Sequence, residues 1–133
     1  MGCFVSNFSF FKKGKQNVAT NIDGSIVVIG APENQGQGSN GSMSGHVRIY
    51  NWDGANWIQI GQDIDGINSN DYSGHSVASN LNGDIIAVGS YGDDFNGAES
   101  GKISIYKNIN NMWVQLGQDI NGEHAFSFMG RND

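Results

Sequence analysis

The residues of this chain that could perform nucleophilic chemistry are few and lie far apart in the sequence. Gly74-His75-Ser76-Val77-Ala78 resembles the glycine-flanked segment that presents a catalytic serine between a strand and a helix. No helix is expected after Ser76, because no stretch of the chain shows helical periodicity. His46, His75 and His124 have neither metal-ligand nor catalytic spacing. We therefore predict no catalytic residue and a protein that is not an enzyme, with a hydrolase as the alternative.

No cofactor is predicted either. Gly36 to Gly41 has the spacing of a dinucleotide-binding loop, but it precedes an expected strand instead of opening the helix that such a loop requires. Cys3 is the single cysteine, which excludes a thiolate metal cluster and an intramolecular disulfide.

The first residues carry a possible membrane anchor. Gly2 with Ser6 fits the N-myristoylation pattern, and Cys3 could accept palmitate. Three lysines that follow, at positions 12, 13 and 15, could contact anionic lipid. Such a combination of signals is what stable anchoring requires, so a membrane-anchored intracellular scaffold is one alternative reading of the chain.

The elements that must position these residues occur twice. Trp57 to Gly66 returns as Trp113 to Gly122, 56 residues later, with seven of ten positions identical. Val18 to Gly30 likewise returns as Val77 to Gly89, after 59 residues. The glycine-rich loop between these two segments is three residues shorter in the second copy, which accounts for the change in displacement. A repeat of this period indicates a solenoid, a propeller or another array.

Each copy reads as short antiparallel strands. Asp23-Gly24 and Asn82-Gly83 predict tight hairpin turns, because both residue types tolerate positive φ. The apolar runs after these turns do not alternate, which is typical of a strand buried on both faces. In the segment from Gly45 to Tyr50, Val47 and Ile49 alternate with polar or aromatic residues, which predicts one buried face.

Four strands in about 57 residues describe the blade of a β-propeller. We therefore predict an all-β fold of about two four-stranded blades, in which Tyr50, Trp57, Tyr106 and Trp113 fill the seams between blades. Propellers usually close with more blades than this, so a partial propeller is expected. The predicted divisions are an N-terminal segment, two repeats and the start of a further repeat, at residues 1–17, 18–73, 74–122 and 123–133.

The repeats resemble the FG-GAP repeat family, the propeller repeats related to the integrin α-subunit head. Gly30-Ala31-Pro32 is a literal Gly-Ala-Pro element directly after an inner strand, and Gly89-Ser90-Tyr91 is its degraded counterpart. Tyr72-Ser73-Gly74 stands where Phe-Gly would be. The repeated Trp-x-Gln-hydrophobic-Gly-Gln-Asp-Ile phrase is similar to that of large secreted surface proteins. The resemblance covers about Val18 to Gly122.

This resemblance implies extracellular recognition or adhesion, and it raises the question of calcium. Integrin-type blades often hold calcium in an acidic loop, but Asn21 to Ser25 and Asn80 to Asp84 have too few carboxylates and too short a turn. The remaining acids are interpreted as solvated turn residues, so no metal ligand is predicted and calcium is kept as the alternative. They are Asp63, Asp65, Asp71, Asp93 and Asp94.

Composition agrees with a binding module. The 133 residues include 20 glycines and carry a net charge of −6, which argues against nucleic acid as a partner. We predict a non-catalytic binding, adhesion or scaffold module from a larger surface or secreted protein. Its partner would be a protein or glycan at the loop face, with possible self-association to complete the propeller. No secretory signal is recognised, since Phe4 to Phe11 is interrupted by polar residues.

Overall fold

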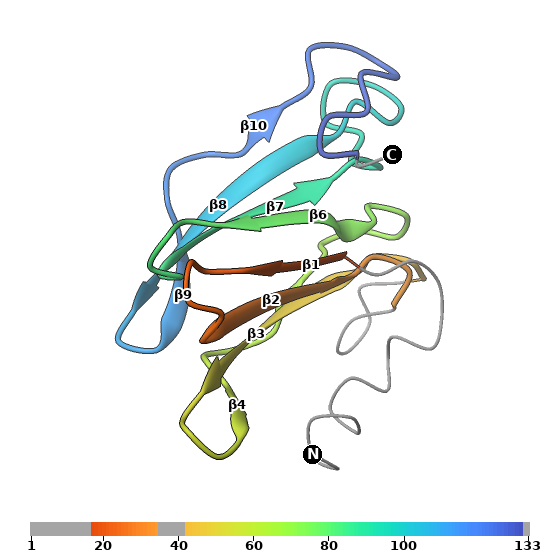
Figure 1. Ribbon diagram of the computed structural model, residues 1–133. Helices are drawn as coiled ribbons and strands as arrows, with labels where there is room; N and C mark the ends of the chain where they lie inside the picture. Colours follow the sequence, from red (N-terminus) through yellow and green to blue (C-terminus); the bar gives the residue numbers. More distant parts are fainter. Residues whose placement is uncertain (1–16, 35–41, 132–133) are drawn as a thin grey trace.

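The computed structural model describes residues 17–34 and 42–131. The possible acylation signals at Gly2 and Cys3, and the glycine-rich Gly36 to Gly41, lie outside these residues. Within the described residues the protein is all-β, in two antiparallel sheets that pack against each other (Figure 1). These residues include no helix long and apolar enough to cross a membrane.

Each repeat forms one sheet. The first contains β1 (Asn17–Thr20), β2 (Ile26–Ala31), β3 (His46–Trp52), β4 (Trp57–Gln59) and β5 (Ile64–Asp65). The second contains β6 (Ser73–Ser79), β7 (Ile85–Ser90), β8 (Lys102–Ile109), β9 (Met112–Gln115) and β10 (Ile120–Asn121). The strand order is β1-β2-β3-β4 in the first sheet and β6-β7-β8-β9 in the second, with β5 paired to β3 and β10 paired to β8.

The outer strand is divided in two, which differs from the predicted four strands in each repeat. β4 ends at Gln59 and β9 ends at Gln115, and the chain bends two residues later at Gly61 and Gly117, which have φ values of 69° and 70°. The chain then returns to the same neighbour, where Ile64 pairs with Val47 and Ile120 pairs with Ile103. The repeated phrase thus supplies two short strands and the bend between them.

The predicted hairpins are confirmed, and an asparagine stabilises each of them. Gly24 and Gly83 have φ values of 76° and 80° in the turns between β1 and β2 and between β6 and β7. The side-chain oxygen of Asn21 accepts a hydrogen bond from the Ile26 amide at 2.9 Å, and that of Asn80 accepts one from the Ile85 amide at 3.1 Å. These bonds satisfy backbone donors at the start of each inner strand.

The main core lies between the two sheets. Val28, Val47 and Ile49 of the first sheet are fully buried there against residues of the second sheet, namely Ile86, Val88, Trp113 and the partly buried Val77 and Tyr106. This confirms the predicted inner strands and the predicted alternation in β3.

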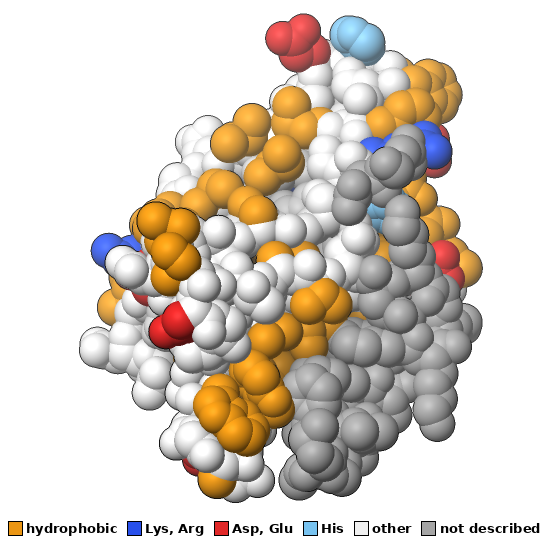
Figure 2. Space-filling model, viewed as in Figure 1, with side chains coloured by type: hydrophobic (Ala, Val, Ile, Leu, Met, Phe, Trp, Pro, Cys, Tyr) orange, Lys and Arg blue, Asp and Glu red, His pale blue; other side chains and the backbone are white. Residues whose placement is uncertain are grey.

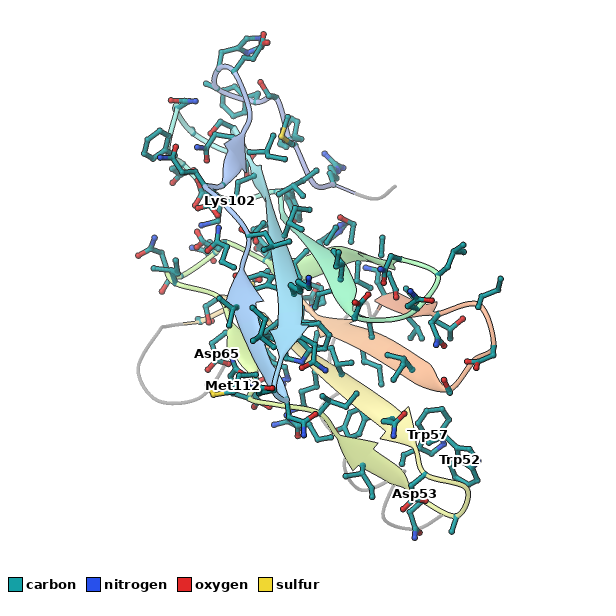
Figure 3. The ribbon with its side chains drawn as sticks, turned by 90° about the vertical axis from the view of Figure 1, so that its left-hand side faces the viewer. Trp52, Asp53, Trp57, Asp65, Lys102 and Met112 are labelled. Carbon is teal, nitrogen blue, oxygen red and sulfur yellow. The ribbon has the colours of Figure 1, made fainter. Side chains whose placement is uncertain are left out.

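Tyr50 and Trp57 do not lie in this seam. They pack with Val27 and Ile29 in a separate cluster on the opposite face of the first sheet. At the tip of the β3–β4 hairpin, the rings of Trp52 and Trp57 are 5.4 Å apart (Figure 3). Of the four aromatic residues predicted to fill the seams between blades, Tyr106 and Trp113 lie in the seam between the two sheets, whereas Tyr50 and Trp57 lie on the outer face of the first sheet. Tyr50 and Tyr106 lie on equivalent faces of their sheets, and these faces point in the same direction because the sheets stack in the same orientation. This face of the second sheet meets the first sheet, whereas this face of the first sheet points away from the second.

The segment after β10 repeats the backbone that leads into β6. Tyr72 and Gly74 have φ values of 54° and 91°, and Phe128 and Gly130 have values of 52° and 86°. Gly45 forms a parallel bridge with Ser73, and Gly101 forms the same bridge with Met129. The described chain therefore ends with the backbone of a third repeat already seated on the second sheet.

Candidate binding site at the loop end of the sheets

The long connections of both sheets gather at one end, and the short hairpin turns lie at the other (Figure 1). Backbone hydrogen bonds join neighbouring loops. The Tyr72 amide donates to the Met43 carbonyl at 3.1 Å, the Gly92 amide to the Asp71 carbonyl at 3.1 Å, and the Phe126 amide to the Ala98 carbonyl at 2.8 Å. The loop end is therefore one connected surface.

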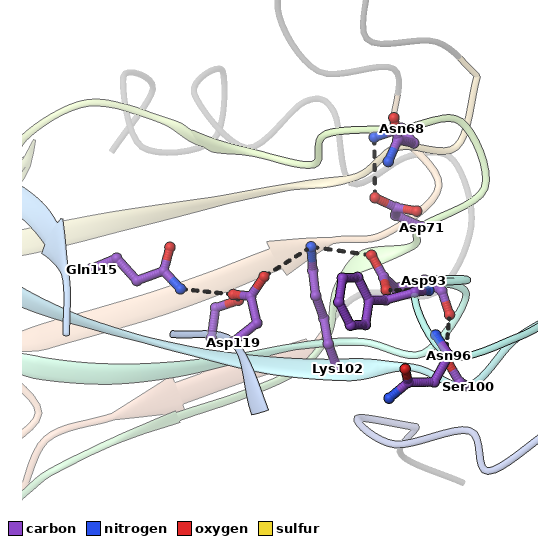
Figure 4. Close-up of polar contacts among 10 residues, drawn as sticks. Asn68, Asp71, Asp93, Asn96, Ser100, Lys102, Gln115 and Asp119 are labelled. Carbon is purple, nitrogen blue, oxygen red and sulfur yellow. Dashed lines mark hydrogen bonds and ion pairs between the residues drawn. The ribbon is translucent and has the colours of Figure 1, made fainter. Parts of the chain in front are cut away.

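A buried ion cluster lies beneath this surface. Lys102, the first residue of β8, is 8% exposed, and its Nζ lies 3.1 Å from Asp93 Oδ2 and 3.5 Å from Asp119 Oδ2 (Figure 4). Asp119 Oδ1 also accepts hydrogen bonds from Ser104 Oγ at 2.6 Å and Gln115 Nε2 at 2.7 Å. One ammonium thus connects the β7–β8 loop to the repeated phrase.

Electrostatics favour the ionised form of this lysine. Burial alone would lower the pKa of Lys102, but the hydrogen bond to Asp93 and the nearby carboxylates raise it above its ordinary value. Burial opposes ionisation of Asp119 as well, yet the hydrogen bonds from Ser104 and Gln115 bring its pKa below the usual value. Burial raises the pKa of Asp71, with Asp93 adding to the effect. The single ammonium of Lys102 thus offsets part of the charge of the three acids around it.

The acids of the loop end also accept hydrogen bonds from backbone amides. Asp71 Oδ2 accepts from the Asn68 amide at 3.0 Å, Asp93 Oδ1 from the Phe95 amide at 3.0 Å, and Asp94 Oδ1 from the Glu99 amide at 2.7 Å. They are turn acids, as interpreted from the sequence. The description as solvated is wrong for two of them, because Asp71 is 3% exposed and Asp93 is 6% exposed.

The remaining acid candidates lie elsewhere. The Asp63 carboxylate accepts hydrogen bonds from Arg48 Nε at 2.9 Å, from Arg48 Nη2 at 3.1 Å and from Gln59 Nε2 at 2.6 Å. Asp65 lines a cavity between the sheets. Among the described residues, no group of three or more His, Cys, Asp or Glu is arranged to hold a metal ion.

The cavity between the sheets is small and polar. It measures about 30 Å³, and its lining includes Asp65, Asp71, Lys102 and Asp119. A cavity of this size has room for a water molecule or two but not for an organic ligand. The ion cluster therefore fixes the loops beneath the outer surface of the loop end.

That outer surface carries large apolar side chains on the loops. Phe95 is 74% exposed, Ile67 66% and Phe126 62%. The loops of Phe95 and Phe126 are neighbours, because a Cβ at Gly97 would lie 3.0 Å from the Cβ of Ala125. The loop end therefore exposes large apolar side chains on loops that hydrogen bonds fix in place.

An aromatic cluster supports this surface from the side. Tyr72 and Tyr91 stack with ring centroids 4.9 Å apart, and Phe128 lies 6.5 Å from Tyr91. The Arg131 guanidinium lies over both rings, 5.8 Å from Tyr91 and 5.1 Å from Phe128. Cation–π contacts of this kind stabilise the start of the third repeat against the second sheet.

The residues considered for nucleophilic catalysis have structural roles. Ser76 lies on β6, where its Oγ donates to the Gly130 carbonyl at 2.8 Å, and the His75 ring packs edge-on against Tyr91 at 4.6 Å. His46 lies on β3 of the first sheet, and His124 lies in the loop after β10. The three histidines thus belong to three different elements, namely β3, β6 and the loop after β10.

Sequence reasoning missed Lys102 and its pairing with Asp119. A signal was present, because Asp63 and Asp119 recur four residues after Gln59 and Gln115, and both glutamines donate to them. The residue opposite each of these acids on the neighbouring strand is Arg48 in one copy and Ser104 in the other.

Two antiparallel sheets of equal construction, stacked in the same orientation, define blades of a β-propeller-type fold. Residues 65–106, from β5 into β8, match the family model described as the FG-GAP repeat. This match confirms the resemblance to the FG-GAP repeat family that was expected from the sequence. A search of curated proteins found no match to the chain.

The buried His46 gives a testable pH dependence. Burial, aided by the charge of Arg48, lowers the pKa of His46 from 6.5 to about 4. Between these pH values the unfolded chain binds more protons than the folded one, so stability falls as the pH is lowered from 6.5 toward 4. We expect a loss of up to about 3 kcal/mol by denaturant unfolding. The loss should shrink in His46→Gln, and an ordinary imidazole pKa in an NMR titration would contradict the assignment.

Proposed function

We propose that this chain is a non-catalytic binding module that holds a protein or glycan ligand at its loop end. The single observation that supports this most is the exposure of Phe95, Ile67 and Phe126 on loops that hydrogen bonds hold in place. Apolar anchors on a rigid support lose little conformational entropy on binding. Figure 2 shows hydrophobic side chains at the upper right of the molecule, over this end.

An extracellular or cell-surface location is part of the same proposal. FG-GAP repeats are typical of extracellular and surface proteins, and the matched repeat provides that support. The net charge of −6 disfavours nucleic acid as a ligand. Metal is not needed for this binding, because the loop carboxylates already accept backbone amides or the Lys102 ammonium.

The test is a binding measurement with paired variants. Purified protein is applied to a glycan array and to a panel of immobilised extracellular-matrix proteins, in calcium and in a chelator. Phe95→Ser with Phe126→Ser should weaken any specific binding about 10-fold or more, because exposed aromatic anchors dominate such contacts. Calcium removal should leave the binding unchanged.

The control is a matched pair at the opposite end of the sheets. Ile22 and Leu81 are 75% and 68% exposed on hairpin turns that meet through the bond from the Ile22 amide to the Leu81 carbonyl. Ile22→Ser with Leu81→Ser should leave binding unchanged. Equal losses from both pairs, or no binding to any probe, would refute the proposal for the loop end.

A further inference from the structure

One tryptophan of the repeated phrase forms hydrogen bonds across the contact between the two sheets. Trp113 is 3% exposed and belongs to the second sheet, but its hydrogen bonds go to the first. Its indole Nε1 donates to the Ile60 carbonyl at 2.9 Å. Its backbone amide donates to Gln62 Oε1 at 3.1 Å, and Gln62 Nε2 donates to the Trp113 carbonyl at 2.9 Å.

The residue between these two partners is a glycine for a steric reason. A Cβ on Gly61 would lie 2.9 Å from Trp113 Cδ1, closer than side-chain atoms approach one another. We call Ile60, Gly61 and Gln62 the socket for Trp113. The Ile60 carbonyl accepts from the indole, the missing side chain of Gly61 leaves room for the ring, and the Gln62 side-chain amide pairs with the Trp113 backbone. The Trp-x-Gln-hydrophobic-Gly-Gln phrase thus contains a tryptophan plug at its start and a socket at its end.

The second copy of the phrase has the same socket at Leu116, Gly117 and Gln118. Gly117 has the same conformation as Gly61, with φ values of 70° and 69°, but nothing lies within 4 Å of a Cβ built on it. Leu116 is 41% exposed. Within the part of the chain that the structure describes, the second socket is open.

The sheet around the open socket is apolar and repeats the covered face of the first sheet. Val28, Val47, Ile49 and Ile64 are at most 6% exposed beneath the second sheet. The equivalent positions in the second repeat are Ala87, Ile103 and Ile105, which are half-buried, and Ile120, which is 52% exposed.

Two shallow depressions of about 220 and 170 Å³ mark this face, and their lining includes Ala78, Ala87, Ile103 and Ile105. Figure 2 shows a band of hydrophobic side chains over the second sheet. Among the residues that the structure describes, this surface is covered on the first sheet and open on the second.

We propose that this open face docks one sheet of a further FG-GAP repeat, whose tryptophan enters the Leu116-Gly117-Gln118 socket. The indole donates to the Leu116 carbonyl, and the Gln118 amide pairs with the backbone of that tryptophan, as Ile60 and Gln62 do with Trp113. The occupant is fixed by continuity with the interface already present between the two sheets. The position of Gly130 supports a further repeat as the occupant. The Gly130 carbonyl accepts a hydrogen bond from Ser76, and the Gly130 Cα would lie 2.8 Å from a Cβ built on Gly89. Gly74 makes the same close approach to Gly30 at the start of the second repeat.

The experiment extends the natural chain by one repeat of its own. Residues 1–129 are followed by a second copy of residues 74–131, so that the copied Gly74 takes the position of Gly130. Hydrogen exchange is expected to show new protection of the amides from Met112 to Ile120. An added repeat that remains unprotected, or amides at these positions that stay exposed, would overturn the proposal.

Glutamine variants test the socket itself. In the natural chain Gln62→Ala should reduce the folding equilibrium about 10-fold, the effect of losing a pair of hydrogen bonds with compensation from water. Gln118→Ala should leave it unchanged within about 2-fold, as for other substitutions on an exposed surface. In the extended chain both substitutions should have the larger effect, and an unchanged Gln118→Ala variant there would overturn the proposal.

A second copy of this chain is the competing occupant. Light scattering of the natural chain distinguishes the two, since a monomer is expected here. A discrete dimer with Leu116 and Ile120 protected from exchange would assign the face to self-association and overturn the proposal of a further repeat.

Discussion

Gly45→Ala is expected to destabilise the protein by about 3 kcal/mol or more, from a backbone penalty and a steric clash together. Gly45 has a φ of 81°, a conformation that costs any residue with a Cβ. An added Cβ would also lie 2.2 Å from the Ser73 carbonyl oxygen and 2.6 Å from the Ser73 nitrogen. Both atoms belong to the backbone at the junction between the two repeats, so neither can rotate away. Denaturant unfolding measures the loss.

Gly24→Ala separates the two contributions. Gly24 has a nearly equal φ of 76°, but a Cβ added to it would have nothing within 4 Å. The free energy of unfolding of Gly24→Ala should therefore fall by only about 1 kcal/mol, from the backbone penalty without a steric clash. If the two variants lost the same stability, the close approach between Gly45 and Ser73 would not be a feature of the folded protein.

Lys102→Met is expected to cost about 3–5 kcal/mol at neutral pH, because it leaves buried carboxylates without their cation. Asp93 is 6% exposed and Asp71 3% exposed, so neither is well solvated when its counter-charge is removed. The alkyl part of methionine preserves the packing of the lysine chain, so the loss reports on charge. Lys107→Met, on the opposite face of the same strand, is the control and should cost less than about 1 kcal/mol.

The pH dependence of this difference identifies the ammonium as the cause. The folded-state pKa of Lys102 is raised above 10.5, so its contribution is complete below that pH and is lost as the pH rises through the folded value. The gap in unfolding free energy between natural protein and Lys102→Met should therefore narrow in strong alkali. A gap that stays constant from neutral pH upward would mean that packing, not charge, explains the loss.

The local parts of the fold could be predicted from the sequence because they depend on neighbouring residues. Asp23-Gly24 and Asn82-Gly83 specify their turns through φ preference alone, and the alternation at Val47 and Ile49 specifies which face is buried. Each pattern occurs in both copies of the repeat, so the two copies predict the same turn and the same buried face independently.

The parts that were missed depend on pairing between distant strands. The division of the outer strand follows from the positive φ of Gly61 and Gly117, which the apolar pattern of the phrase does not show. Lys102 meets Asp93 and Asp119 only because β7, β8 and β10 adopt one particular register. The loop-end surface was expected in general terms, but the exposure of Phe95 and Phe126 depends on how the loops bond to each other.

Because both sheets stack in the same orientation, the two outer faces of the stack are unlike. An isologous dimer requires one surface to recognise itself, whereas the surface around Trp113 on the second sheet recognises a different surface, around Ile60 and Gln62, on the first. Growth by this contact is head-to-tail, and the rotation from one sheet to the next decides between a closed ring and an open fibre. The twist between two neighbouring blades therefore determines the symmetry of any assembly that this contact could build.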